Sequence, residues 1–344
     1  MKNKIIFFSI DRLGDYLIRS NVIKEISKNY INTEIISSDI NFKLINSQTF
    51  FNKIIKFDTK NKNINKIKFI KNFYNKKYNY FICFDGKSIS NFLLLIIKAD
   101  FKHTFIYKKE GLYNKIKLKI LLKILKILNI SYTILYNRNL IEKGINENYP
   151  SKYKLLKKFY PNITNETYYL DNFYKSNIFN FKNYIVIHMD EKFCDINNVE
   201  KELNKYLLNL SKKIEKKIII TSYNNKNIYY KNLSIDKIQF DNYKNVKNIL
   251  NKKIFILEEV PLKEFCDLIY NSSLNISCHA GFFVHMSLFY KLNTIDILNE
   301  AEERWVNSWI SNKETYNVIY KSNLDNKIQI EEIFKKIEIQ VNKQ

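Results

Sequence analysis

The segment SIDRLGDYLIRS (residues 9–20) places a carboxylate where it could act as a general base. An apolar, strand-like run ends at Ile10, Gly14 permits a tight turn, and Asp15 opens a run with helical spacing. A carboxylate beyond the carboxyl end of a parallel strand faces the ligand side of the sheet, where it can remove a hydroxyl proton. The same carboxylate could instead cap the helix by accepting N–H bonds from its first turn. The sequence leaves both roles open for Asp15.

A second chemically informative segment, residues 253–298, has its centre in the loop Ser277–His285. Its apolar spacing predicts a repeating α/β unit: strands at 254–257 and 274–277, helices at 262–271 and 282–290, and a final strand. In such a unit, backbone N–H groups and a helix N-terminus converge on an anion after a strand. We therefore expect a phosphate-binding loop around Gly281.

The elements that must position these residues alternate along both halves of the chain. In the first half, strands are predicted at 5–10, 34–37, 54–57, 80–85 and 103–107, and helices at 16–30, 62–75 and 89–98. In the second half, strands are predicted at 184–188 and 217–222, and helices at 197–213, 243–251 and 328–340. The strands are continuous apolar runs, which favours parallel sheets covered on both faces.

Residues 140–180, which contain Pro150 and Pro161, break this alternation and are interpreted as the passage between two domains. The prediction is an α/β protein with a first domain at 1–165, a second at 180–325 and a C-terminal helix at 326–344. Ligands of such sheets bind beyond the carboxyl ends of the strands, so the cleft between the domains is the expected active site.

The order of these motifs resembles the bacterial lipopolysaccharide heptosyltransferases, glycosyltransferase family 9. An RLGD-helix lies near the N-terminus, the alternation restarts in the middle, and a strand–Gly–His–helix segment lies near the end. The resemblance covers roughly residues 4–310. It implies a GT-B fold of two facing Rossmann-like domains, with the acceptor on the first domain and the nucleotide-sugar on the second. It also implies inverting, metal-independent transfer.

Carried over residue by residue, the resemblance gives Asp15 the role of the base that deprotonates the acceptor. Arg12 and Gly14, in the same motif, belong to the acceptor side. Lys192 falls where the family has a lysine that would neutralise the departing diphosphate. Ser222 stands where the family has a glycine-containing turn under the nucleotide. The alternative for Lys192 is an ordinary surface lysine.

The family's glycine loop usually reads Asp-Ser/Thr-Gly-x-x-His, whereas this chain reads CHAGFFVH (278–285). The acidic and hydroxyl positions are missing, and His285 follows Gly281 by four residues. Backbone N–H groups can still bind the diphosphate, because they need no particular side chain. The donor-site residues expected here are His279, Ala280, Gly281, Phe282 and His285. A histidine on an apolar helix face could equally be a packed core residue.

The net charge of the chain bears on a different class of function, nucleic-acid binding. The 344 residues carry a formal charge of +23, but arginine occurs at only four positions, 12, 19, 138 and 304. Arginine is the usual reader of guanine edges and the bidentate phosphate clamp, so this composition disfavours nucleic-acid binding.

The four cysteines lie far apart without a CxxC pair, which is typical of reduced thiols in a cytoplasmic protein.

Residues 112–130 predict a basic amphipathic helix, with Lys115, Lys119, Lys123 and Lys126 along one face. It could pack on the sheet with a solvated lysine face, or attract an anionic membrane surface through residues 112–128. The N-terminal apolar run is too short for an export signal, and no stretch of about 18 apolar residues could span a bilayer.

Together these observations predict a glycosyltransferase, cytoplasmic or held peripherally on the inner membrane. It would move a sugar, with heptose as one option, from a nucleotide diphosphate to a lipid-anchored cell-envelope glycan such as lipopolysaccharide. No cofactor or metal is expected beyond this co-substrate, for which ADP is the nucleotide that the resemblance suggests. The alternative is a non-catalytic relative that keeps the fold and binds a nucleotide or a glycan.

Overall fold

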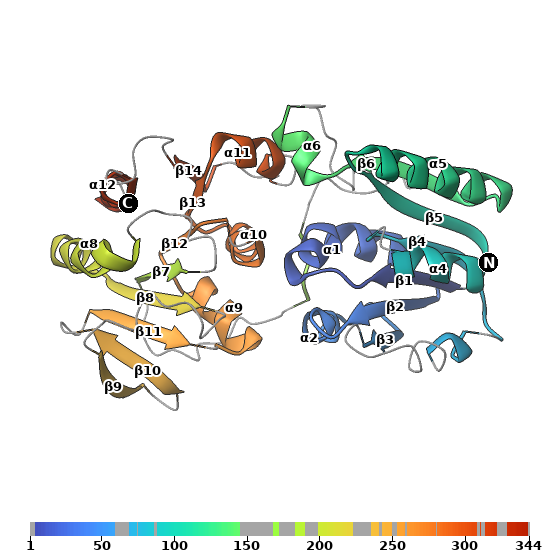
Figure 1. Cartoon of the computed structure of the whole chain (residues 1–344). Coiled ribbons are helices and arrows are strands. Elements are labelled where there is room, and N and C mark those ends of the chain that lie inside the picture. Colours follow the sequence, from blue (N-terminus) through green and yellow to red (C-terminus); the bar gives the residue numbers. More distant parts are fainter. Residues whose placement is uncertain are drawn as a thin grey trace. The chain divides into compact units, whose positions relative to one another are not determined.

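The computed structural model describes residues 4–58, 69–73, 75–85, 88–144, 168–171, 183–189, 199–222, 235–240, 243–249, 253–258, 260–279, 281–307, 310, 314–321 and 329–342. The chain divides into two compact units (Figure 1). The first contains residues 1–171 and 303–311, and the second contains residues 172–302 and 312–344. Each unit has its own sheet and its own core.

The first unit is built on a six-stranded sheet with the order β3-β2-β1-β4-β5-β6, in which all neighbours are parallel. Its strands are β1 (Lys4–Ser9), β2 (Asn32–Ser38), β3 (Lys53–Phe57), β4 (Lys77–Cys83), β5 (Lys98–Lys108) and β6 (Ser131–Tyr136). Its helices are α1 (Leu13–Ser27), α2 (Phe42–Ile45), α4 (Ser88–Ile96), α5 (Leu112–Ile127) and α6 (Arg138–Glu142). The order reverses between β1 and β4, as in a Rossmann sheet.

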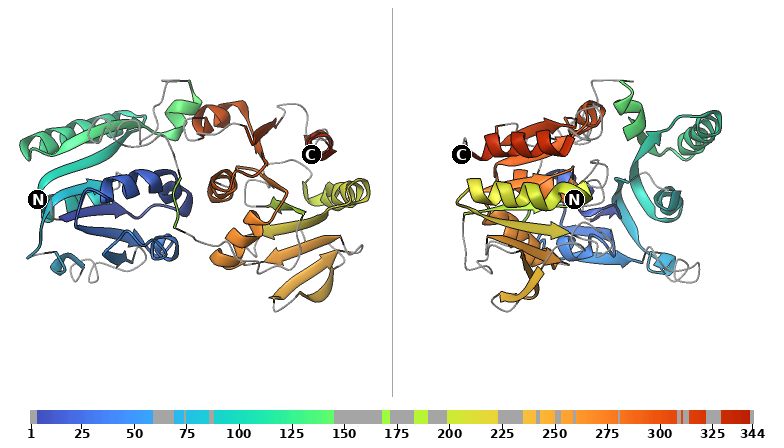
Figure 2. Two further views of the ribbon diagram at one scale, coloured as in Figure 1. Left: turned by 180° about the vertical axis from the view of Figure 1, so that it is seen from behind. Right: turned by 60° about the vertical axis from the view of Figure 1, so that its left-hand side comes forward.

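The central strands form for the reason the sequence suggested, because both of their faces are covered. Ile5, Ile6, Phe7 and Phe8 of β1 are all fully buried. One face packs against α4 and α5 in a cluster with Leu93, Leu94 and Leu125. Figures 1 and 2 show α5 as a long helix at the margin of this unit.

The second unit has an eight-stranded sheet with the order β14-β13-β12-β7-β8-β11-β10-β9. Its strands are β7 (Tyr184–His188), β8 (Lys217–Ser222), β9 (Ile235–Phe240), β10 (Tyr243–Ile249), β11 (Ile254–Glu258), β12 (Leu274–Ser277), β13 (Thr294–Leu298) and β14 (Tyr316–Tyr320). The helices that follow are α8 (Val199–Lys213), α9 (Leu262–Tyr270), α10 (Gly281–Phe289), α11 (Glu300–Val306) and α12 (Gln329–Asn342). Residues 303–306 of α11 belong to the first unit.

Six of these strands, from β14 to β11, run parallel and repeat the Rossmann order, and β9 and β10 continue the sheet as an antiparallel hairpin. The predicted helix at 243–251 is therefore wrong. Its residues Val246–Ile249 pair with Ile254–Leu257 of β11, so ladder hydrogen bonds overrode the local helical spacing. Strands β6, β9 and β14 and helices α2, α6 and α11 were not predicted.

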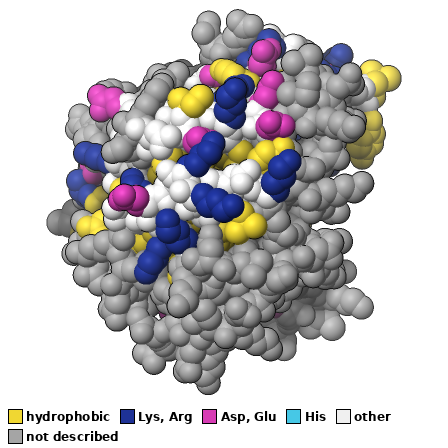
Figure 3. All heavy atoms as spheres, turned by 90° about the vertical axis from the view of Figure 1, so that its left-hand side faces the viewer, with side chains coloured by type: hydrophobic (Ala, Val, Ile, Leu, Met, Phe, Trp, Pro, Cys, Tyr) yellow, Lys and Arg dark blue, Asp and Glu magenta, His cyan; other side chains and the backbone are white. Residues whose placement is uncertain are grey.

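The surface formed by α8 and α12 mixes charges instead of gathering one sign. Lysine side chains lie among carboxylates and apolar side chains on this face (Figure 3). One such pair joins Nζ of Lys213 on α8 to Oε2 of Glu338 on α12 at 2.8 Å. Exposed ion pairs of this kind contribute little to stability. Because lysines and carboxylates alternate here, the described part of this face has no continuous basic stripe.

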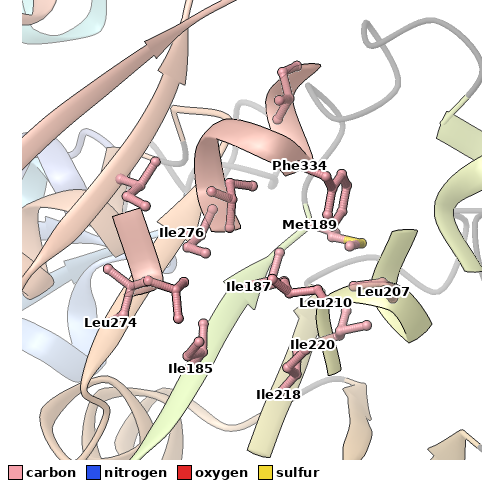
Figure 4. Packing of buried hydrophobic residues seen from close by; sticks show 14 of the residues in the cluster. Ile185, Ile187, Met189, Leu207, Leu210, Ile218, Ile220, Leu274, Ile276 and Phe334 are labelled. Atoms are coloured by element: carbon pink, nitrogen blue, oxygen red, sulfur yellow. The ribbon is translucent and has the colours of Figure 1, made fainter. Parts of the chain in front are cut away.

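Beneath these two helices lies the core of the second unit (Figure 4). Ile185 and Ile187 of β7, and Ile218 and Ile220 of β8, point into it with Phe334 of α12. The predicted last helix is confirmed, and its residues Ile333, Phe334 and Ile337 are each at most 5% exposed. This helix therefore packs as part of the second unit.

Two other predicted helices are confirmed only in part. The helix expected at 112–130 ends at Ile127, because Asn129 adopts a left-handed φ of 54°. Of the basic helix expected at 62–75, residues 69–71 are helical, and 59–68 and 74 lie outside the described residues. Among the described residues, no helix is long and apolar enough to cross a membrane.

Candidate functional site

The first unit brings three carboxylates to the edge where its strand order reverses. Asp11 follows β1 and Asp85 follows β4, the two strands that flank the reversal. Asp15 lies in the first turn of α1. Ligands of doubly wound sheets bind at this point, outside the carboxyl ends of the strands. The topology therefore places Asp15 at the edge of the sheet where ligands of this fold bind.

The detailed geometry at the start of α1 differs from the sequence expectation. Arg12 is the N-cap residue, with extended backbone at φ −67° and ψ 164°, and Asp15 is the third residue of the helix. The helix-cap interpretation of Asp15 is therefore wrong, although its charge still favours the positive end of the helix. Gly14 is a buried helical residue, so it does not form the predicted turn. Its neighbours Arg12 and Asp15 are exposed and half-buried, respectively.

A buried ion pair lies directly behind this helix N-terminus. Nη2 of Arg19 donates to Oδ2 of Asp11 at 2.5 Å, and the Arg19 side chain is 3% exposed. The guanidinium carbon also lies 5.4 Å from the centroid of the Phe84 ring. Burial opposes the charged form of Arg19, but Asp11 and Asp15 outweigh it and raise the pKa of the guanidinium. Arg19 is thus a fixed cation that interacts with both carboxylates.

These carboxylates line a cavity of about 580 Å³ within the first unit. Its polar wall includes Asp11, Asp15 and Asp85 together with Lys109 and Lys117. Its apolar wall consists of Ile106, Tyr107, Leu118, Leu121 and Trp305. A volume of this size accommodates a small organic ligand, and mixed charges with an aromatic side chain suit a polar ring such as a sugar. Among the described residues, no group of three or more His, Cys, Asp or Glu is placed to hold a metal ion.

The second unit has the corresponding reversal between β7 and β12, and α10 begins just beyond it. Gly281 is the first residue of α10, and apart from its chain neighbours and the backbone of its own helix, no atom of the described residues lies within 4 Å of where its Cβ would be. The backbone φ of Gly281 is ordinary, so the helix does not require glycine there. The missing side chain instead leaves open space beside the helix N-terminus, where an anion can approach the backbone N–H groups. This location confirms the predicted strand, loop and helix around residue 281.

His279 is held rigidly just before this helix. Its backbone adopts a left-handed φ of 52°. Its N–H donates to Oδ1 of Asp296 at 2.7 Å, and its Nδ1 lies 3.1 Å from Oδ2 of the same carboxylate. The hydroxyl of Tyr316 donates to Oδ2 of Asp296 at 2.9 Å. Asp296 thus fixes the imidazole through its Nδ1 edge, as orienting carboxylates do for functional histidines.

His285 is held differently, on the buried side of α10. It is 6% exposed, and burial, with a smaller contribution from His279, lowers its pKa to about 3. His188, at the end of β7, is 1% exposed and has a pKa lowered by burial to about 3. At neutral pH both imidazoles are uncharged, so neither supplies a cation to a phosphate.

The structure does not gather all the predicted donor residues. Gly281, Phe282 and His285 lie on α10, and His279 lies directly before it. Ser222 ends β8, which β7 separates from β12 in the sheet. Lys192 and Ala280 lie outside the described residues.

The site residues that escaped the sequence prediction include three carboxylates, those of Asp11, Asp85 and Asp296. Each follows or interrupts an apolar strand run, in FFSID, YFICFD and TIDIL. Asp296 is fully buried in the middle of β13, where a carboxylate needs specific partners. A carboxylate inside or directly after a predicted parallel strand was the available signal.

Comparisons with known proteins give matches in structure alone. No family description and no curated protein sequence matches this chain. A family 9 glycosyltransferase from Veillonella parvula superposes with a TM-score of 0.62 at 9% identity, covering 97% of this chain and 89% of the other. The E. coli ADP-heptose lipopolysaccharide heptosyltransferase II gives a TM-score of 0.62 at 10% identity, covering 98% and 99%. A proposed UDP-N-acetylglucosamine 2-epimerase from Listeria monocytogenes gives a TM-score of 0.53 at 9% identity, covering 99% of this chain and 89% of the other.

These likenesses extend over nearly the whole chain and identify the α/β fold as GT-B. The expected fold class is therefore confirmed, as is the resemblance to family 9 structures. Both transferases and an epimerase share this fold, so the fold by itself does not assign a reaction.

Proposed function

We propose that this protein is an inverting, metal-independent glycosyltransferase that uses a nucleotide diphosphate sugar. The observation that carries the proposal is Asp15, which lines the cavity of the first unit beside Asp11, Asp85 and two lysines. A glycosyl acceptor bound there would present a hydroxyl to a carboxylate, the group that such a transfer needs as its base.

In the proposed reaction, Asp15 removes the acceptor hydroxyl proton while the hydroxyl oxygen forms a bond to the anomeric carbon. The bond from that carbon to the diphosphate oxygen breaks, and its electron pair leaves with the nucleoside diphosphate. Attack from the face opposite the leaving group inverts the anomeric centre. The neighbouring cation Arg19 interacts electrostatically with Asp15 in the resting protein.

The second unit would bind the donor at the N-terminus of α10. The open space beside Gly281 and the fixed imidazole of His279 support this part of the proposal. The backbone N–H groups of the first helical turn would stabilise the charge that develops on the diphosphate. Lys192 is proposed to add a cation there, and Ser222 to contact the nucleotide. ADP-heptose is the first donor to test, because the structurally similar E. coli protein is named as an ADP-heptose transferase.

The acceptor is proposed to be a lipid-anchored cell-envelope glycan, of which lipopolysaccharide is one type, reached at the cytoplasmic face of the inner membrane. The two lysines of the cavity, Lys109 and Lys117, suit an acceptor that carries negative charge.

The first experiment is a thermal-shift screen of the purified protein against ADP, UDP, GDP and CMP without added metal. We expect selective stabilisation by one nucleoside diphosphate, and loss of that shift in Lys192→Ala. A response to none of them by the folded protein contradicts the donor site and favours a non-catalytic role for the fold.

The second experiment measures turnover of the sugar donor identified by that screen. Asp15→Asn should reduce turnover by about 10²–10⁴-fold, because it removes general-base catalysis, while the nucleotide affinity stays unchanged. Asp100→Asn is the matched control, since Asp100 belongs to the same unit but is exposed and pairs with Lys77. Equal activity of the two variants would remove Asp15 from the mechanism.

A further inference from the structure

Helix α5 exposes a row of large apolar side chains to solvent. Leu112 is 75% exposed, Ile120 is 57% exposed and Ile127 is 72% exposed. At about 3.6 residues per turn, these positions lie on one side of the helix with Ile116 and Ile124, which are also exposed. Contiguous apolar side chains on a surface mark an interaction site, because water disfavours their exposure.

The rest of the unit fixes this helix so that the row cannot turn inward. The opposite side of α5 packs on the sheet through Leu125, which is 1% exposed, and through Leu118, Leu121 and Leu122. At the C-terminal end, Ile130 donates its N–H to the Leu125 carbonyl at 2.8 Å, and the intervening Asn129 is left-handed. This is a Schellman cap, which locks the end of the helix. Rotating the row inward would expose the buried Leu125 and the three half-buried leucines.

The charges beside the row indicate what covers it. Helix α5 carries five lysines and no acidic residue. Lys115, Lys119, Lys123 and Lys126 border one edge of the row, and Lys117 borders the other; all five are exposed. A partner that fits must therefore offer an apolar interior next to negative charge.

We propose that α5 binds an anionic phospholipid membrane, with its isoleucine row in the acyl boundary and its lysines at the headgroups. Amphipathic helices with flanking lysines bind lipid surfaces in this way, and the lysine stems reach outward from the apolar layer. A second copy of the chain fits less well, because pairing two such rows would bring two sets of five lysines together. On the same sheet face, α4 also exposes Phe92 and Leu95, at 47% each.

This inference rests on the proposed function, which it deepens by naming the surface that meets the acceptor's membrane. Helix α5 also supplies Asn114, Lys117, Leu118 and Leu121 to the wall of the cavity that contains Asp15. One helix would thus contact the lipid on one side and border the acceptor cavity on the other. A glycan anchored in that membrane would need to extend only past α5 to reach the cavity.

The test is co-sedimentation of the full chain with vesicles of phosphatidylcholine alone or mixed in equal parts with phosphatidylglycerol. We expect binding to the mixed vesicles, and a decrease of about tenfold or more in Ile116→Asp/Ile120→Asp, which places two charges in the acyl boundary. The matched control is Ile31→Asp/Ile339→Asp, which changes two exposed isoleucines outside α5 by the same charge. The control should bind like the wild type.

A second pair of variants tests the lysines. Lys119→Glu/Lys123→Glu should weaken binding to the mixed vesicles by about 30-fold or more, because two surface cations are lost at roughly 1 kcal/mol each and two negative charges are gained. Lys335→Glu/Lys336→Glu on α12 makes the same charge change on exposed residues elsewhere and should bind like the wild type. Equal weakening in both pairs would mean that net charge drives binding, and would overturn the role of α5.

The proposal is also overturned if the wild type does not sediment with the mixed vesicles, or if Ile116→Asp/Ile120→Asp binds them normally. Sedimentation velocity without lipid provides a further check. A dimer that this variant abolishes would assign the row to a second copy of the chain. Vesicle binding needs neither donor nor turnover, so its failure is separable from a failure of the nucleotide screen in the same preparations.

Discussion

At the scale of single residues, burial sets the charge state of three of the four histidines. His103 is 1% exposed, and burial lowers its pKa to about 4. Burial likewise lowers the pKa of His188 and of His285 to about 3 each. In the folded chain these imidazoles stay neutral at pH values where an unfolded chain would protonate them. His279, which Asp296 holds near the surface, is the one that the donor-site proposal uses.

The difference between the pKa of a buried histidine in the folded chain and its pKa in the unfolded chain predicts how stability depends on pH. Between pH 6.5 and about 3 the unfolded chain binds a proton at His188 and the folded chain does not, so stability falls as the pH falls. One such group contributes up to about 1.4 kcal/mol per pH unit in this window. His188→Asn cannot titrate, so urea unfolding should show a shallower loss of stability on acidification than in the wild type.

The comparison is between slopes of the unfolding free energy against pH, because the substitution also disturbs the contact between Nδ1 of His188 and Oγ1 of Thr221 at 2.9 Å. An offset between the two curves is expected at neutral pH. Parallel curves throughout the window would contradict a neutral, buried His188.

Residue types predicted the site only in part. Asp15 was expected near the start of a helix because Gly and Asp follow a strand run, and it lies in the first turn. Asp11 was overlooked because its role depends on Arg19, eight residues later, and Asp85 because its strand lies beside β1 only in the folded sheet. Such pairings come from topology, which local sequence patterns do not contain.

At the scale of elements, the end of α10 shows a local strain that can be relieved. Lys291 adopts a left-handed φ of 57°, and the N–H of Leu292 donates to the carbonyl of Ser287 at 2.9 Å. This is the Schellman geometry, in which glycine is preferred because a Cβ disfavours positive φ. Lys291→Gly should therefore stabilise the protein by about 0.5–1 kcal/mol, measured by urea unfolding.

The same exchange within a regular helix should have the opposite sign. Lys335 is an exposed residue inside α12, and Lys335→Gly should destabilise by about 1 kcal/mol, because glycine gains backbone freedom in the unfolded chain. If both variants lose stability equally, the left-handed position of Lys291 is not a source of strain.

Which elements could be predicted depended on how each one is buried. Central strands such as β1, β7 and β12 are continuous apolar runs, and their predicted positions agree with the structure within a residue or two. Residues 235–249 contain many polar side chains without a clear period, so their hairpin is defined mainly by pairing with β11. Edge strands such as β6 and β14 are partly exposed, so they lack the continuous apolar run that identified the central strands.

At the scale of the whole molecule, the two Rossmann-type units have separate cores, so a ligand can stabilise one unit without stabilising the other. The core of the second unit joins β7, β8 and β12 to α8 and α12, and its described members all belong to that unit. A ligand that binds only one unit in its folded form stabilises that unit by mass action. Amide hydrogen exchange can therefore locate the donor site, since it measures opening region by region.

We expect the nucleoside diphosphate selected in the thermal screen to slow exchange in β12 and α10 of the second unit. Where exchange requires unfolding of that unit, a ligand concentration about 100 times its Kd should slow it about 100-fold. The amides of β1 and β4 in the first unit serve as the control within the same sample, because the proposed donor contacts lie in the other unit. In Lys192→Ala, the same ligand concentration should protect β12 and α10 less. Protection centred on β1, β4 and α1 instead would place the nucleotide beside Asp15, and would reverse the proposed assignment of donor and acceptor to the two units.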